Sequence, residues 1–492
     1  MAGAARAASA PRGATAHRAS GQDGLFGVPE RFMRPRVVFI AVTAVIVGFG
    51  LLMVYSASSV TALADFGDSA YYLKRQLLFA AAGTAAAVFL AWSDYHLWSE
   101  RLVNVIWAGT ILLLLLVFIT AGDAYGATRW IAIGGFQLQP SEFAKITIVL
   151  VAASLAQRYF EEGTIDWWTF VKLMAIGVGL PIVLIVLQPD KGSTMVLGIT
   201  IVTMGYLAGV PKRILAVFLV LGILGFLGLS LRDDYSRQRL LTMLNPESDP
   251  YGAGYQLLQG FYAFGSGGLF GVGIGFSKQK YSYLPMAHND FIFAVIGEEC
   301  GLLGTLGLLA GFALFAWAGF RIALHAPDLA GRLIAAGCTT LVVIQMLLNV
   351  AGVIGIFPLS GKPIPFVSYG GSSVIASLML AGMVVSVSAH SHLPETAHDG
   401  ARRSLRVTEG DAADAGLSLV GEPRPRSARG ADAGRGPRLT VMDGGARSRA
   451  AGRTDGRPAG RVTTDARGRR RVDLGPDAAE RLRSRRGPRG RR

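Results

Sequence analysis

The chain has 492 residues, of which 51% are hydrophobic and only 16% are charged. Soluble proteins usually carry about 25% charged residues, so the composition argues against a soluble globular protein and favours a membrane protein. The net charge of +15 lies at the two ends, since residues 391–492 hold 24 Arg, no Lys and 13 acidic residues. Residues 1–36 add six Arg against two acidic residues, and the segment between is neutral overall. This distribution argues against a basic nucleic-acid-binding domain.

In chain order, residues 1–36 predict a disordered tail, and ten apolar runs follow. Each run is close to the roughly 20 residues that cross the hydrocarbon core as a helix. The runs cover residues 37–55, 76–92, 102–120, 141–157, 168–187, 193–209, 213–231, 290–319, 332–357 and 368–388. The first run lacks a clear cleavage site and predicts an uncleaved span. Residues 391–492 predict a second disordered tail, because so few apolar residues cannot offset the chain entropy.

Lys and Arg near the spans predict the orientation. Arg31, Arg34 and Arg36 stand against the first span and place the N-terminal tail in the cytoplasm. Ten spans then return the C-terminal tail to the same side. The longest loop, about 232–289, falls outside, although it contains five cations. This exception suggests that the external loop meets an anionic molecule.

Six glycines of the external loop lie between Gly265 and Gly275. A dinucleotide-binding loop would need a preceding strand and a following helix, and the sequence shows neither. We therefore expect a re-entrant or surface-lying loop with close backbone packing. The two cysteines, Cys300 and Cys338, stand in apolar runs and predict buried thiols without a disulfide.

Asp290 ends the external loop and directly precedes the eighth span. An aspartate here is either an ordinary helix N-cap or a catalytic carboxylate. Asn289 is an alternative cap that would free Asp290 for chemistry. Shielding from water would raise the pKa of Asp290, whereas a helix N-terminus would lower it. Glu298 and Glu299 lie about 12–13 Å further along the helix, and such buried carboxylates require partners.

Further polar residues lie at the span ends. Glu142 and Lys145 are three residues apart on one helix face and form either an isolated ion pair or a polar cavity lining. Arg129 either reaches lipid headgroups or clamps a pyrophosphate, which suits its forked guanidinium. Lys362 is a second external cation. Ser368 belongs to a run of small residues that permits close helix packing.

Six stretches together resemble the SEDS family, which includes FtsW, RodA and SpoVE. They are GATRWI (126–131), QPSEFAKI (139–146), LNPESDPYGAGYQ (244–256), GSGGLFGVGIG (265–275), YLPMAHNDFIFAVIGEECGLLG (283–304) and PLSGKPIPFVSYGGSS (358–373). The short spacing between Gly275 and Tyr281 is closer to the cell-division type than to the elongation type. The sequence departs from the family pattern at Met286, where Glu is common, and at Asn289, where Thr is common.

The resemblance implies an all-α membrane domain over residues 37–390 that polymerises lipid II at the outer face of the bacterial cytoplasmic membrane. It implies that Asp290 is the general base on the acceptor hydroxyl, and that Arg129 and Lys362 neutralise the leaving pyrophosphate. Glu142 and Lys145 match a family pair near the cavity, and His288 and Ser368 lie in matching motifs that we expect to bind substrate. The implied partners are a class B penicillin-binding transpeptidase and other division proteins at the septum. Mg²⁺ or Mn²⁺ is a candidate cofactor, although the sequence shows no protein-only metal site.

Three other functions fit parts of the pattern. Intramembrane charges suit a lipid II flippase as well as a polymerase, and an elongation polymerase shares the same motifs. A scaffold that only recruits a penicillin-binding protein would leave Asp290 and the external cations unexplained. The Arg-rich C-terminal tail is either a ligand for anionic lipids or acidic proteins, or a solvated linker.

Overall fold

The computed structural model describes residues 30–120, 129–133, 136–232, 234–281 and 283–390, and the short segments 461–464 and 470–473. The chain divides into two units, residues 1–394 and 395–492, which we consider separately. The predicted disorder of the two tails concerns residues that lie mostly outside the described ranges. Two strands of the second unit, β3 (Arg461–Thr464) and β4 (Arg470–Asp473), pair antiparallel within the predicted C-terminal tail.

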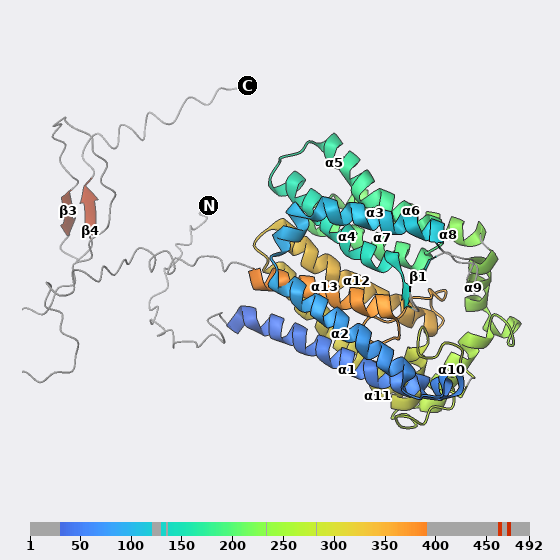
Figure 1. Ribbon diagram of the computed structural model, residues 1–492. Coiled ribbons are helices and arrows are strands. Elements are labelled where there is room, and N and C mark those ends of the chain that lie inside the picture. Colours follow the sequence, from blue (N-terminus) through green and yellow to red (C-terminus); the bar gives the residue numbers. More distant parts are fainter. Residues whose placement is uncertain are drawn as a thin grey trace, which may run out of the picture. The chain divides into compact units, whose positions relative to one another are not determined.

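The first unit is helical, and every predicted span coincides with a helical stretch (Figure 1). The ten stretches are α1 (Glu30–Phe66), α2 (Tyr71–Trp92), α3 (Val103–Thr120), α4 (Pro140–Ala156), α5 (Trp167–Met174) continuing into α6 (Leu180–Leu187), α7 (Lys191–Leu207), α8 (Lys212–Arg232), α11 (Ile292–Leu324), α12 (Leu329–Val353) and α13 (Gly371–His390). Among the described residues, eight of these stretches are long and apolar enough to cross a membrane. The prediction of an all-α, multi-pass membrane protein is confirmed.

The predicted and observed spans differ in three places. α1 begins at Glu30, so the first helix includes the last residues of the predicted N-terminal tail. The apolar part of α3 and the helix α7 have 17 residues each, whereas α4 continues through the π-helical turn Gln157–Glu161 to a stretch of 22 residues. The predicted short span 76–92 is instead a full 22-residue helix, because residues 71–75, which include the charged Lys74 and Arg75 and so lie outside the apolar run, are also helical.

The segment 232–289 contains more regular structure than its sequence indicates. It holds α9 (Asp234–Leu244), a 3₁₀ turn (Pro246–Ser248) and α10 (Tyr255–Gly267). A short antiparallel hairpin of β1 (Ile131–Ile133) and β2 (Phe136–Leu138) precedes α4. Strands of three residues are too short to show an alternating pattern, and α10 is stabilised by packing on α11.

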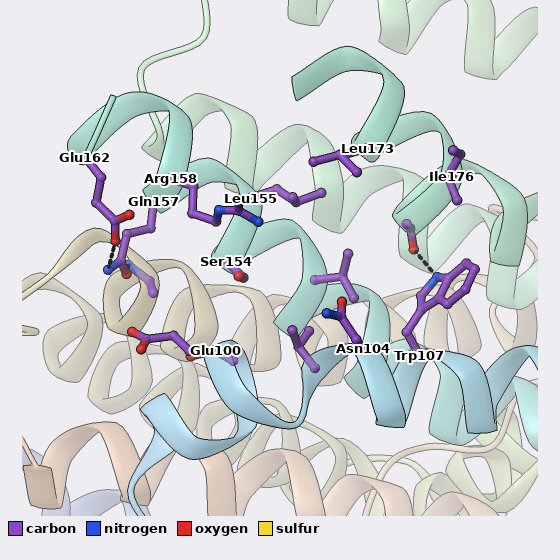
Figure 2. A pocket seen from close by; sticks show the side chains of 15 residues that line it. Glu100, Asn104, Trp107, Ser154, Leu155, Gln157, Arg158, Glu162, Leu173 and Ile176 are labelled. Atoms are coloured by element: carbon purple, nitrogen blue, oxygen red, sulfur yellow. Dashed lines mark hydrogen bonds between the residues drawn. The ribbon is translucent and has the colours of Figure 1, made fainter. Parts of the chain in front are cut away.

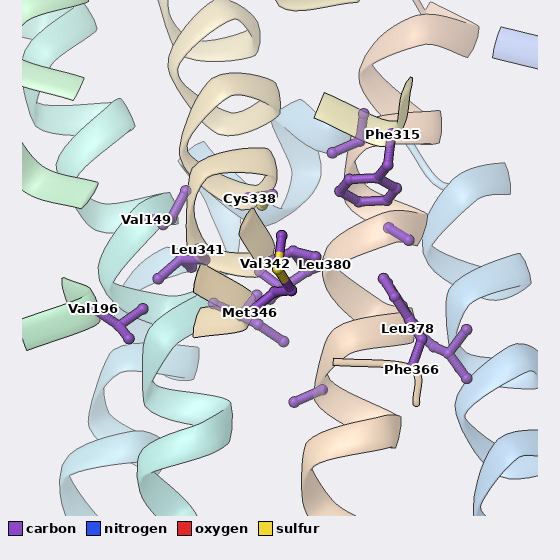
Figure 3. Packing of buried hydrophobic residues seen from close by; sticks show 14 of the residues in the cluster. Val149, Val196, Phe315, Cys338, Leu341, Val342, Met346, Phe366, Leu378 and Leu380 are labelled. Carbon is purple, nitrogen blue, oxygen red and sulfur yellow. The ribbon is translucent and has the colours of Figure 1, made fainter. Parts of the chain in front are cut away.

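The core of the first unit surrounds α12, which packs against α4, α7, α11 and α13. Figure 3 shows Cys338, Val342 and Met346 of α12 among apolar side chains of the neighbouring helices. Both cysteines are free thiols, as predicted, but only Cys338 is buried, whereas Cys300 is partly buried. The central position of α12 means that polar side chains at its end are fixed relative to several helices at once.

The glycine-rich segment packs its backbone directly against a break in α11, which confirms the expected close backbone packing. Gly301 interrupts α11 with a φ of 67°. The amides of Val272 and Gly273 donate to the carbonyls of Glu298 and Glu299 at 2.9 and 3.0 Å. The segment therefore satisfies carbonyls that the interrupted helix leaves without their usual partners.

Gly271 is expected to be the most sensitive glycine of this segment. It has a φ of +81°, and a Cβ there would lie 2.2 Å from the Glu299 carbonyl oxygen. Gly271→Ala should lower the free energy of unfolding by about 3 kcal/mol or more, from backbone strain and overlap together. At Gly275 (φ +88°), an added Cβ meets no atom of the described residues within 4 Å. Gly275→Ala should therefore cost only about 1 kcal/mol of backbone strain. Equal losses in an unfolding titration with sodium dodecyl sulfate would contradict this packing.

Candidate active site

Asp290 does not cap α11. The N-cap residue of α11 is Phe291, and no side chain caps it. The Asn289 amide instead donates to the Met286 sulfur at 3.6 Å. Within the described part of the chain, the Asp290 carboxylate accepts no hydrogen bond, whereas its main-chain oxygen accepts one from Asn349 at 2.9 Å. A helix N-cap, the role that the local sequence favoured for Asp290, is therefore not its role in the structure.

The Asp290 carboxylate borders a narrow recess of about 10 Å³, roughly the room of one water molecule. Arg239 of α9 lies across the recess. A Cβ added at Gly361 would be 3.6 Å from both Asp290 Oδ2 and Arg239 Nη1. The Arg239 guanidinium also donates to the Leu359 carbonyl at 2.6 Å. The Asp290 carboxylate and the Arg239 guanidinium therefore lie on either side of Gly361, which has no side chain to separate them.

Two larger spaces adjoin this recess. A cleft of about 410 Å³ shares Arg239, Gln256 and Leu359 with it. A smaller cavity of about 60 Å³ shares Arg239 and Leu359 and is also lined by Arg129 and Lys191. Arg239 therefore lines all three spaces: the recess beside the Asp290 carboxylate, the cleft of about 410 Å³ and the basic cavity.

The half-buried position of Asp290 changes its acidity. Burial raises the pKa of the Asp290 carboxyl above its ordinary value, and the charges of Arg239 and Lys362 act in the opposite direction. A carboxylate with a raised pKa is a better proton acceptor near neutral pH than an ordinary aspartate.

Lys362 does not stand at the membrane surface as an exposed cation, as the sequence suggested. Its side chain is only 2% exposed and pairs with two carboxylates, Asp190 Oδ2 at 2.9 Å and Glu142 Oε1 at 3.4 Å. Glu142 also pairs with Lys145 at 2.7 Å, which confirms the expected ion pair on one face of α4. Lys145 donates in addition to Gln345 of α12. Asp190, Lys362, Glu142 and Lys145 therefore form one buried network in which acidic and basic side chains alternate.

Asp190 belongs to this charge network, but the sequence analysis did not identify it. It precedes α7 and caps it, since Oδ1 accepts from the Ser193 amide at 3.1 Å. Its Oδ2 accepts from Lys362, from Ser141 at 2.8 Å and from Gln139 at 3.1 Å. Burial opposes its charge, but Lys362 and Arg129 outweigh burial and lower the pKa of Asp190. The available signal was a Pro-Asp-Lys sequence between two apolar runs, which resembles an ordinary cap.

Arg129 lies beside this network. Its guanidinium donates to the carbonyls of Gln188, at 3.3 Å, and Pro189. It also lines the basic cavity with Lys191 and Arg239. Three cations from separate segments therefore surround a space next to Asp290.

His288 and Ser368 have structural contacts in the described residues. The His288 ring packs against Tyr72 and Tyr369, with centroids 4.5 and 5.6 Å apart. Burial lowers the pKa of His288 to about 4, so the ring is neutral at pH 7. The Ser368 hydroxyl accepts from the Ile364 amide at 2.8 Å. Their expected contact with substrate stays a prediction.

Three buried polar side chains hold the loops around Asp290. The Asn349 amide of α12 donates to the main-chain oxygens of both Asp290 and Lys362, the second at 2.7 Å, and so joins their two loops. Glu298 accepts from the Lys278 amide at 2.9 Å, and Glu299 accepts from Ser56 of α1 at 2.7 Å. Glu298 and Glu299 thus fasten the segment that leads to Asp290. Asn349 was missed because one amide in an apolar helix carries no motif.

Comparison with known proteins agrees with this arrangement. Residues 36–393 match the family of FtsW, RodA and SpoVE, described as cell cycle proteins. A probable peptidoglycan glycosyltransferase FtsW of Geobacter metallireducens is 41% identical over 72% of this chain and 94% of its own length. Stage V sporulation protein E of Bacillus subtilis is 39% identical over 73% of this chain and 98% of its own.

Two solved structures share the fold. A chain of a peptidoglycan synthase complex, described for its coordination of polymerization and crosslinking, has a TM-score of 0.58 and 27% identity over 72% of this chain and 98% of that one. The rod shape determining protein RodA of Thermus thermophilus has a TM-score of 0.53 and 26% identity over 72% of this chain and 97% of that one. With six motifs in order, the matching fold and a family match over most of its length, this chain belongs to the FtsW/RodA/SpoVE family and is FtsW-like.

Proposed function

We propose that this protein is a peptidoglycan glycosyltransferase that polymerises lipid II into glycan strands at the outer face of the cytoplasmic membrane during septal cell-wall synthesis. The observation that carries the proposal is the Asp290 carboxylate, which is half-buried, accepts no hydrogen bond in the described residues, and borders a recess that adjoins a cleft of about 410 Å³. The relatives named as peptidoglycan glycosyltransferases support the reaction class.

The reaction requires one base and one stabilised leaving group. Asp290 accepts the proton of the 4-hydroxyl on the acceptor GlcNAc, and that oxygen attacks the anomeric carbon of the donor MurNAc. The bond from this carbon to the pyrophosphate breaks, undecaprenyl pyrophosphate leaves with the electron pair, and the anomeric configuration inverts. A base within hydrogen-bond reach of the attacking hydroxyl contributes about 10²–10⁴-fold to such a step.

The cations around the basic cavity are suited to the pyrophosphate. Arg129, Lys191 and Arg239 line one space adjoining the recess, and forked guanidinium groups bind phosphate oxygens in pairs. The family resemblance implied that Lys362 neutralises the leaving pyrophosphate. Its two carboxylate partners make it better suited to positioning the loop 358–370 than to binding the leaving group directly.

Mg²⁺ or Mn²⁺ stays a proposal. No three His, Cys, Asp or Glu side chains of the described residues gather as in a metal site. With one carboxylate at the recess, a divalent ion would take most of its ligands from pyrophosphate oxygens and water, as Mg²⁺ commonly does.

The partners and location follow from the family. A solved relative belongs to a complex that coordinates polymerization and crosslinking. We propose a class B penicillin-binding transpeptidase and other division proteins as partners, at the septum, with both termini in the cytoplasm. Arg31, Arg34 and Arg36 beside the first span agree with that orientation, whereas the five cations of the loop 232–289 are the exception to it.

An assay in detergent distinguishes polymerisation from flipping. A micelle has no two leaflets, so lipid II cannot be flipped there, whereas it can still be polymerised. Purified protein with lipid II, alone and with a class B transpeptidase whose crosslinking is blocked, should yield glycan strands resolved by gel electrophoresis. If lipid II stays monomeric in both reactions while the protein is folded, the enzyme assignment is wrong and the flippase alternative gains support. Sidewall instead of midcell localisation of a fluorescent fusion would favour an elongation polymerase.

A further inference from the structure

Figure 2 shows a second cavity from close by. It is lined by Ala330 at the start of α12, whereas Asn349, near the other end of α12, contacts Asp290. Its volume of about 440 Å³ falls within the range of about 300–1,000 Å³ that is typical of small-ligand sites. α4 passes from Glu142, in the buried charge network, to the cavity residue Arg158, which is about 24 Å away at 1.5 Å per residue. This cavity is therefore separate from the proposed active site.

Three π-helical turns border this second cavity. They are Leu97–Arg101, Gln157–Glu161 and Ala175–Gly179, and they are the only π-helical turns in the part of the chain that the structure describes. Such turns are rare and occur frequently at functional sites. The carbonyl of Gly177, in the third turn, accepts a hydrogen bond from Trp107 at 3.0 Å (Figure 2). The departure of three neighbouring helices from α geometry at one cavity points to a ligand site.

The rim of the second cavity carries charges of both signs. Arg158 is exposed and makes no hydrogen bond or ion pair through its guanidinium within the described ranges. Glu162 accepts from Gln157 at 2.9 Å. Figure 2 shows Arg158 extending over the cavity, with Glu100 and Glu162 to one side of it. The rim thus offers one forked cation and two carboxylates to a ligand that carries both charges.

Part of the wall of the second cavity is apolar. Its apolar side chains are Val103, Trp107, Val151, Leu155, Leu173, Ile176 and Ala330, and Ser99, Asn104 and Ser154 line the wall between them. A polar ligand alone would leave this wall exposed to water, and a hydrocarbon alone would leave the rim charges unused. The cavity therefore fits an amphipathic ligand with a zwitterionic head.

We propose that this cavity binds one phospholipid with a phosphoethanolamine headgroup. The lipid phosphate pairs with the Arg158 guanidinium, which donates two parallel hydrogen bonds. The primary ammonium has three donors for the carboxylates of Glu100 and Glu162. An acyl chain lies along the apolar wall. Phosphatidylglycerol lacks the ammonium, so it would leave both carboxylates unpaired beside its own negative charge.

Native mass spectrometry of the purified full chain, titrated with phosphatidylethanolamine or phosphatidylglycerol, tests this site. We expect one tightly bound phosphatidylethanolamine. Arg158→Gln should weaken its binding about tenfold, as expected for the loss of one charge-assisted pair. Arg101→Gln is the matched control, because Arg101 is exposed, adjoins Glu100 and does not line the cavity. Its affinity should equal that of the wild type.

Two further comparisons test the headgroup and the chain. A Glu100→Gln, Glu162→Gln double variant should bind the two lipids about equally, since it removes the ammonium partners. Glycerophosphoethanolamine, the headgroup without chains, should not compete at equal concentration. Equal binding of both lipids to the wild type, or equal weakening by Arg101→Gln and Arg158→Gln, would indicate an unspecific lipid shell and overturn the proposal.

Discussion

Asp290→Asn is expected to reduce lipid II polymerisation by about 10²–10⁴-fold, the contribution of a general base. Asparagine fills the same space but cannot accept the proton of the acceptor hydroxyl. Lipid II binding should change little, because the cleft and the three cations of the basic cavity remain. The rate is measured with purified protein in detergent, with lipid II well above its half-saturating concentration.

The stability of Asp290→Asn separates a chemical defect from a folding defect. Burial raises the folded-state pKa of Asp290 above its unfolded value, so at neutral pH the ionised carboxylate disfavours the folded state. The amide removes this cost, and the variant should melt at a temperature at least as high as the wild type. Asp234→Asn, an exposed residue at the start of α9, is the control and should retain full activity. An inactive variant that also melts early would point to a structural role instead.

Lys362→Met is expected to lower the free energy of unfolding by about 3–5 kcal/mol, the usual cost of breaking a buried ion pair from one side. Asp190 and Glu142 would each lose a cationic partner while they stay buried. Burial opposes the charge of Lys362, but these carboxylates outweigh burial and raise its pKa, so the lysine is charged at neutral pH. Unfolding is measured in mixed micelles with sodium dodecyl sulfate.

Two comparisons make the Lys362 experiment specific. Lys172→Met, at an exposed position of α5, should change stability by less than about 0.5 kcal/mol. Combining Lys362→Met with Asp190→Asn removes both charges of the closest pair. The double variant should therefore lose less than the sum of the two single losses. Strict additivity would show that the two side chains do not act as a pair.

Much of the fold could be predicted from the sequence because membrane spans have a strong local signal. A run of about 20 apolar residues is sufficient to predict a helix, wherever its neighbours lie. The helices α9 and α10 of the segment 232–289 carry no such signal. α10 contains glycines that suggest a loop, and it is held as a helix by contact with α11, far away in sequence.

From the sequence, site residues could be predicted only where they belong to a recognisable motif. Asp290 was identified by its motif, although its local sequence favoured a helix cap. Lys362 was placed in the wrong environment, because its position beside a span does not reveal that Asp190, 172 residues earlier, faces it. Arg239, Asp190 and Asn349 owe their importance to tertiary contacts between separate segments, and a single sequence does not show such contacts.

The pH dependence of polymerisation in Arg239→Gln tests the role of Asp290 most directly. As the base, Asp290 must be ionised, so kcat/KM of the wild type should fall in acid as the pH drops through its raised pKa. The Arg239 charge favours the carboxylate, and its removal raises that pKa further. The acid limb of Arg239→Gln should therefore move to higher pH, while Arg237→Gln, on the exposed side of α9, keeps the wild-type profile. Identical acid limbs in all three proteins would contradict Asp290 as the catalytic base.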